Sequence, residues 1–154
     1  MKKFLLLLIV PFLSFGQIPI TDDNIQNAVD EWLSNPASAM EIYGNISEWD
    51  VSNVTDMSYL FQYAYSFNDD ISEWDVSSVT DMSYLFQYAY SFNQDIGNWD
   101  VSNVTTMKEL FAQAWVFNQN IGNWNTSNVV DMESIFQHAL EFNQDIGNWD
   151  VSNV

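Results

Sequence analysis

A six-residue segment, Trp-Asp-Val-Ser-Asn-Val, returns with small variations through most of the sequence and constrains the fold more than any other feature. It first occurs at 49–54, and its tryptophan recurs every 25 residues. Such a fixed period is the signature of a stacked-repeat architecture, in which each unit buries its apolar side against its neighbours. The tryptophans that open the five copies are Trp49, Trp74, Trp99, Trp124 and Trp149.

The apolar residues inside one unit are spaced for two different elements. Trp74 and Val76, two apart with Asp75 between them, are typical of the inward residues of a short strand. The next apolar residues fall at i, i+3, i+4 and i+7, which is one face of a short helix. These helix residues are Met82, Leu85, Phe86 and Ala89. The sequence therefore predicts an α/β repeat solenoid, with a parallel sheet on one face and short helices on the other.

The repeat and the residues before it divide the sequence into three segments. Residues 1–16 begin with two lysines and an apolar stretch, as a signal peptide does, and we expect cleavage near Gly16-Gln17. Residues 17–45 do not fit the repeat and predict an N-terminal helical cap. Because the chain stops at Val154 within a unit, we expect a truncated last unit and a longer parent protein. The repeats occupy 46–154, with units starting near Ile46, Ile71, Ile96, Ile121 and Ile146.

The predicted cap contains two helical patterns. Thr21 is a favourable N-cap residue, and acidic residues follow it where the helix dipole favours them. Apolar residues then recur at helical spacing as far as Leu33. Asn35-Pro36 ends this first helix and starts a second one over 37–42, which Gly44 stops.

The repeat resembles known families. Ile-x-x-Trp-x-Val resembles the core of leucine-rich repeats, and Leu-Phe-x-x-Ala-x-x-Phe resembles the repeat of BspA-like bacterial surface proteins. The longer pattern W-D-V-S-N-V-T-D-M-x-x-L-F is similar to the 25-residue repeats of listerial-type bacterial surface proteins, a domain of unknown function, and covers residues 46–154. The resemblance implies a leucine-rich-repeat-like solenoid on an exported protein linked to adhesion. It also places valine where ordinary leucine-rich repeats carry a buried asparagine, so we expect a different asparagine ladder at Asn68, Asn93, Asn118 and Asn143.

The charge restricts the partners. After residue 16 the chain has one lysine against 21 acidic residues, a net charge of −20 (1 − 21). This field repels nucleic acid and anionic lipid, so we expect neither as a partner. The apolar stretch at the N-terminus is shorter than the ~20 residues of a membrane span, so no transmembrane segment is expected in the mature chain. The absence of cysteine excludes disulfides and thiolate metal sites.

One column of the repeat carries acidic residues between the two inward residues, so these side chains should face solvent. They can form a solvated acidic face, bond to the N–H groups of the following turn, or bind a partner. Calcium is a further hypothesis, because stacked acids supply the oxygen ligands that it prefers. The outward column is Asp50, Asp75, Asp100, Asn125 and Asp150. The loop acids considered for calcium are Asp69, Asp70, Asp95 and Asp145.

Tyrosines form a second candidate surface. Tyr59, Tyr63, Tyr84 and Tyr88 should lie on the predicted helix away from its apolar face. Such residues either pack on each other and on the next unit, or form an exposed aromatic stripe that contacts a partner. The repeating tryptophans, in contrast, are expected in the core because they share the register of isoleucine and valine.

No catalytic constellation is evident. His138 is the only histidine, and no serine or second histidine lies in register with it. A blade of a WD-type propeller needs about 40–45 residues, which excludes that fold for a 25-residue unit. We therefore expect a secreted or cell-surface bacterial protein, not an enzyme and without a resident cofactor, that binds protein or glycan. A structural spacer that projects another domain is the alternative.

Overall fold

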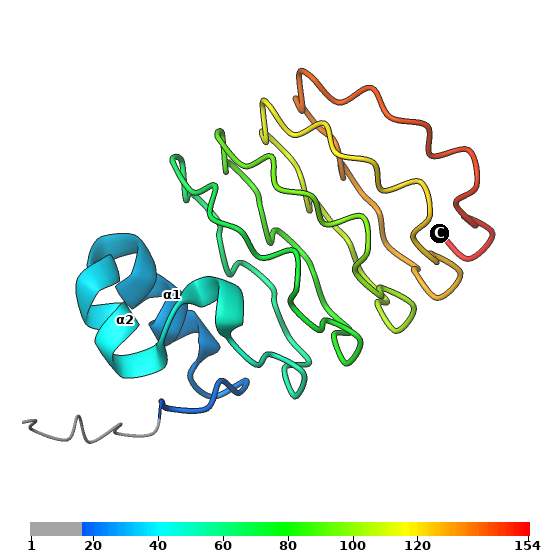
Figure 1. Cartoon of the computed structure of the whole chain (residues 1–154). Helices are drawn as coiled ribbons and strands as arrows, with labels where there is room; N and C mark the ends of the chain where they lie inside the picture. The colour runs from blue at the N-terminus through cyan, green and yellow to red at the C-terminus, as the bar shows by residue number, and fades with distance from the viewer. Residues whose placement is uncertain (1–16) are drawn as a thin grey trace, which may run out of the picture.

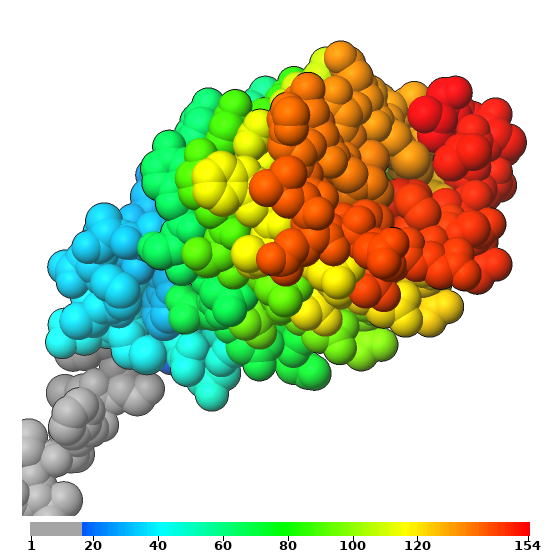
Figure 2. All heavy atoms as spheres, turned by 90° about the horizontal axis from the view of Figure 1, so that it is seen from above, coloured from blue at the N-terminus to red at the C-terminus, as the bar shows by residue number. Residues whose placement is uncertain are grey.

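The computed structural model describes residues 17–154, so the predicted signal peptide lies outside the described residues. The chain begins with helices α1 (Ile25–Ser34) and α2 (Pro36–Tyr43) and the short 3-10 helix η1 (Ile46–Glu48). From residue 49 on, the chain has no regular helix or strand and winds once for each 25-residue unit. We call each winding a coil, and the coils lie side by side in sequence order (Figure 1). A view from above shows these coils as successive layers, with the last one at the end away from the helices (Figure 2).

The two helices occur where the sequence predicts them. The apolar side of α1 is buried against the first coils, and Pro36 opens α2 after Asn35, whose side chain accepts a bond from the N–H of Ser38. The prediction of Thr21 as N-cap is wrong. The carbonyl oxygen of Thr21 accepts bonds from the N–H groups of Asn24 and Ile25, so residues 21–24 form a turn and α1 begins later.

The predicted short helices are absent from the described repeats, and this prediction is wrong. In the first coil, the N–H groups of Leu60, Gln62 and Ala64 donate to carbonyls three residues back. The alternate N–H groups, at Tyr59 and Tyr63 for example, donate instead to carbonyls of the following coil. An α-helix uses all of these donors internally, so the segment is a row of tight turns tied to its neighbour.

The predicted parallel sheet is also wrong, and with it the α/β solenoid of leucine-rich-repeat type. Within residues 17–154 no strand forms, and the only strand-like pairings are isolated parallel bridges such as Asp56 with Asp81. The Trp-Asp-Val segments make no backbone ladder with each other. Side chains join the units instead, because the indole N–H groups of Trp74, Trp99, Trp124 and Trp149 each donate to a carbonyl near the start of the preceding unit. For Trp99 the acceptor is the Ile71 carbonyl, at 3.2 Å.

The core is a set of stacked side-chain columns that run through the coils. Phe61, Phe86 and Phe111 stack at centroid distances of 5.5 and 5.8 Å, and a second phenylalanine column lies beside them. Trp49, Trp74, Trp99 and Trp124 are 3–5% exposed, which confirms their expected place in the core. Stacked aromatic pairs add stabilisation of about 0.5–1.5 kcal/mol beyond the apolar area that they bury.

The predicted asparagine ladder is present in the return loops. The side-chain oxygen of Asn93 accepts bonds from the N–H of Asn118 at 2.9 Å and from the side-chain amide of Gln119 at 3.0 Å. The backbone N–H of Asn93 donates to the side-chain oxygen of Asn68 in the preceding coil. Asn143 continues the ladder by donating its N–H to Asn118.

One carboxylate in the turn before α1 adds polar contacts between the N-terminal cap and the first coil. Between coils, the Thr55 carbonyl accepts from the N–H of Thr80 at 2.8 Å and from the Thr80 hydroxyl at 3.2 Å. Thr55 itself has no preceding coil, and Asp22 supplies the missing acceptor. The Asp22 carboxylate accepts from the Thr55 N–H at 2.8 Å, the Thr55 hydroxyl at 2.7 Å and the Asp56 N–H at 3.2 Å.

Candidate functional site

The aspartate column faces solvent as predicted, and its side chains bond to the turn that follows. The side-chain oxygen of Asp50 accepts from the N–H and hydroxyl of Ser52 at 3.1 and 2.6 Å. Asn125 makes the same pair of bonds with Ser127, and the other members accept at least the N–H two residues on. The column therefore stabilises its own turns, as one of the sequence-based alternatives proposed.

In three members of the column, Asp50, Asp100 and Asp150, these bonds favour the ionised carboxylate and lower its pKa. The hydroxyl and then the backbone N–H of the following serine lower the pKa of Asp50 and Asp100 below the usual aspartate value. For Asp150 the backbone N–H of Ser152 is the main cause of the lowered pKa. A carboxylate with a lowered pKa is a poor general acid near neutral pH, so these three residues are poorly suited to that role.

The loop acids proposed for calcium have separate structural partners. Asp69 accepts the indole N–H of Trp32 at 2.8 Å. Asp70, Asp95 and Asp145 each accept the N–H of the residue two positions later. Among residues 17–154, no three histidine, cysteine, aspartate or glutamate side chains gather into a group that could hold a metal ion.

The four predicted tyrosines lie on turns rather than on a helix. Each has a left-handed backbone, with φ between 61° and 64°. Tyr59 stacks on Tyr84 at 4.7 Å and 9°, and Tyr63 stacks on Tyr88 at 5.0 Å and 20°. Tyr59 and Tyr63 nevertheless remain 48% and 52% exposed. The pairs thus pack on the next unit and also leave an aromatic surface in contact with solvent.

Three further aromatic residues enlarge this surface, and sequence reasoning missed them. Tyr65 stacks on Tyr90 at 4.9 Å, and Tyr90 stacks on Trp115 at 4.0 Å. Their positions are 25 residues apart, so the repeat period alone was enough to find them. We call the following seven residues the aromatic surface: Tyr59, Tyr63, Tyr65, Tyr84, Tyr88, Tyr90 and Trp115.

The stacking limits what the aromatic surface can bind. Tyr90 has one ring face against Tyr65 and the other against Trp115. Within the pairs, each tyrosine likewise has one face covered by its partner. The surface therefore offers mainly ring edges and phenol groups, while open ring faces remain only at the ends of each column.

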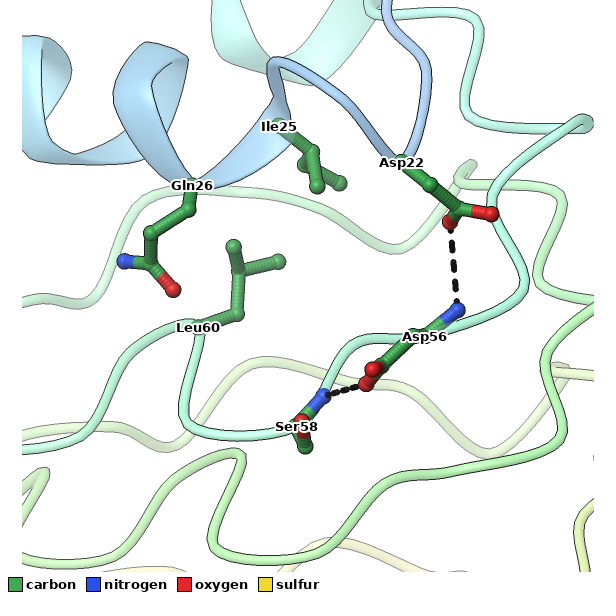
Figure 3. Close-up of a pocket in the computed structure, with 6 residues that line it drawn as sticks. All are labelled: Asp22, Ile25, Gln26, Asp56, Ser58 and Leu60. Atoms are coloured by element: carbon green, nitrogen blue, oxygen red, sulfur yellow. Dashed lines mark hydrogen bonds between the residues drawn. The ribbon is translucent and has the colours of Figure 1, made fainter.

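A small pocket lies between α1 and the first coil (Figure 3). It holds about 210 Å³ and is lined by Asp22, Ile25, Gln26, Asp56, Ser58 and Leu60. Both of its carboxylates already accept hydrogen bonds, Asp22 from the N–H of Asp56 and Asp56 from the N–H of Ser58. His138 is exposed on the last described turn segment, far along the chain from this pocket.

One of the comparisons with known proteins identifies a family. None of the helices over 17–154 is long and apolar enough to cross a membrane. No curated protein and no solved structure matches the chain. The model of the family described as "Mycoplasma protein of unknown function, DUF285" matches residues 27–124 and 96–154. The chain therefore belongs to this bacterial, surface-associated repeat family.

Proposed function

We propose that the protein is a non-catalytic binding module, secreted or displayed at the bacterial surface, and that its aromatic surface contacts a protein partner. Its kinship with the BspA-like and listerial-type adhesion proteins is part of this proposal. The observation that supports it most directly is the exposure of the aromatic surface on coils whose core is already filled by other side chains. Four of its residues are 41–53% exposed, namely Tyr59, Tyr63, Tyr65 and Trp115, and the other three are partly exposed.

The backbone does not require tyrosine at these positions. A left-handed φ raises the conformational free energy of a residue that has a side chain by about 1 kcal/mol or more. The later coils place Glu109, Gln113, Ser134 and His138 at the same left-handed positions. Because the fold accepts polar residues there, the tyrosines of the first two coils are best explained by a contact outside the chain.

A protein partner fits the aromatic surface better than a glycan. Sugar rings stack on open aromatic faces. Most ring faces of the aromatic surface are covered by a neighbouring ring of the same column. Tyrosine edges and hydroxyl groups are favourable at the centres of protein interfaces. The net charge of −20 after residue 16 favours a partner with a basic contact region. The single lysine in this part, Lys108, is paired with Glu133.

The test is saturable binding of purified residues 17–154 to arrays of extracellular-matrix proteins and of glycans. Substitution of Tyr59, Tyr63 and Tyr65 by serine should lower the affinity by at least tenfold, since buried interface tyrosines often contribute more than 1 kcal/mol each. A matched variant with Asp50, Asp75 and Asp100 replaced by asparagine should bind as the wild type does.

Other results would support a different function. If the aspartate variant lost as much affinity as the tyrosine variant, the contact would have to include the aspartate column. Binding to glycans alone would exclude the protein partner. The absence of saturable binding on both arrays would favour the spacer that projects another domain.

A further inference from the structure

Three tyrosine pairs join the first coil to the second in one register. The ring centroids are 4.7 Å apart for Tyr59 and Tyr84, 5.0 Å for Tyr63 and Tyr88, and 4.9 Å for Tyr65 and Tyr90. The planes of each pair lie within 24° of parallel. All three members from the first coil are about half exposed, so their phenol groups are accessible from solvent.

Backbone bonds hold the paired rings together. The Tyr59 N–H donates to the Ser83 carbonyl and the Tyr63 N–H donates to the Gln87 carbonyl, both at 2.9 Å. These bonds fix neighbouring coils beside each other at the residues that carry the rings. The two phenols of a pair are therefore held near each other before any reaction, which makes their coupling effectively unimolecular.

We infer that these pairs are sites of oxidative cross-linking, with hydrogen peroxide as the oxidant acting through a haem peroxidase. Each phenol loses one electron and one proton and becomes a phenoxyl radical. The two radicals form a carbon–carbon bond between the ring positions next to their hydroxyl groups. The hydrogens at these positions then move to the oxygens and restore both phenols. One hydrogen peroxide accepts the two electrons and two protons and yields two molecules of water.

The product would link two coils covalently in a chain that has no cysteine. A bond between Tyr59 and Tyr84 closes a loop of 25 residues and limits the freedom of the unfolded chain, as a disulfide does. Tyr43 serves as an internal comparison, because its ring packs edge-on against Trp49 and stacks on no other tyrosine of residues 17–154.

The experiment treats purified residues 17–154 with horseradish peroxidase and limiting hydrogen peroxide. We expect dityrosine fluorescence, a monomer on a denaturing gel, and loss of two hydrogen atoms from the intact mass for each bond. Cleavage after glutamate should join the peptides 49–73 and 74–109, which carry the two halves of every pair. The midpoint of thermal unfolding should rise after the reaction.

Conservative variants separate cross-linking from folding. Replacement of Tyr59, Tyr63 and Tyr65 by phenylalanine keeps the stacked rings and should abolish the joined peptide. The single variant Tyr43→Phe should give the wild-type yield. Covalent oligomers in place of the cross-linked monomer, oxygen added to Trp115 without the mass loss, or an undiminished yield in the triple variant would each overturn the inference.

Discussion

Removal of the Asp22 carboxylate should weaken the contact between the turn before α1 and the first coil. Asp22→Ala deletes the acceptor of three hydrogen bonds, two from Thr55 and one from the Asp56 N–H. Bonds to a charged acceptor contribute about 1.5–3 kcal/mol in favourable cases, and solvent reduces this at an exposed residue. We therefore expect a loss of about 1–2 kcal/mol in the free energy of unfolding. For a chain of this length, that corresponds to a thermal midpoint lower by about 3–10 °C.

The pH dependence gives an independent measure of the same contact. Burial raises the pKa of Asp22, but the bonds from Thr55 and Asp56 outweigh it and leave the pKa below the usual aspartate value. A group with a lowered folded-state pKa contributes stability that is present above its unfolded pKa of 3.8 and is lost as the pH falls through the folded value. The difference between wild type and Asp22→Ala should therefore be constant at neutral pH and shrink below pH 3.8.

The assay is thermal unfolding followed by circular dichroism from neutral to acid pH. Asp23→Ala is the matched control, because Asp23 is the exposed neighbour and its side chain makes no hydrogen bond within the described residues. Asp22→Asn keeps one acceptor oxygen and should fall between wild type and alanine. Equal midpoints for Asp22→Ala and Asp23→Ala, or a difference that grows in acid, would refute the role of this carboxylate.

Three further predictions concern the stack itself. Trp99→Phe should lower the free energy of unfolding by about 2–4 kcal/mol, because the buried Ile71 carbonyl loses its donor and the smaller ring leaves a void. A chemical denaturation midpoint equal to that of the wild type would contradict this. Asn93→Ala should cost about 1–2 kcal/mol in the same assay, whereas the exposed Asn98→Ala should be neutral, and equal effects would argue against the asparagine ladder. Thermal midpoints in calcium and in EDTA should agree, since the loop acids are already bonded to the chain, and a rise with calcium would restore the metal hypothesis.

The core could be predicted from the sequence because the period and the apolar register both identify it. Trp74 and Val76 share a register with other apolar residues, and both are buried. This inference needs only the alternation of inward and outward side chains, so it holds although no strand forms. The outward place of Asp75 follows from the same alternation.

The turns could not be predicted because their spacing imitates a helix. Met57, Leu60, Phe61 and Ala64 lie at i, i+3, i+4 and i+7, and all four are buried in the turn segment. A run of three-residue turns brings the same positions inward as an eight-residue helix does. Such a short helix is marginal by itself, and the bonds between coils decide the outcome. The sequence alone does not record these bonds.

The bonds between the turn segments of neighbouring coils also give these segments an electrical direction, although the bonds of the threonines before them, such as Thr80 N–H to the Thr55 carbonyl, run the other way. At Tyr59, Phe61 and Tyr63, the N–H points toward the following coil, and the carbonyls that receive these bonds point back. Peptide dipoles in these segments therefore add up along the stack, with the oxygen side toward the helices. A coil inserted in reverse would bring oxygen against oxygen and N–H against N–H. Units of this kind should accordingly be exchangeable between positions or duplicated in steps of 25 residues, but only in one orientation.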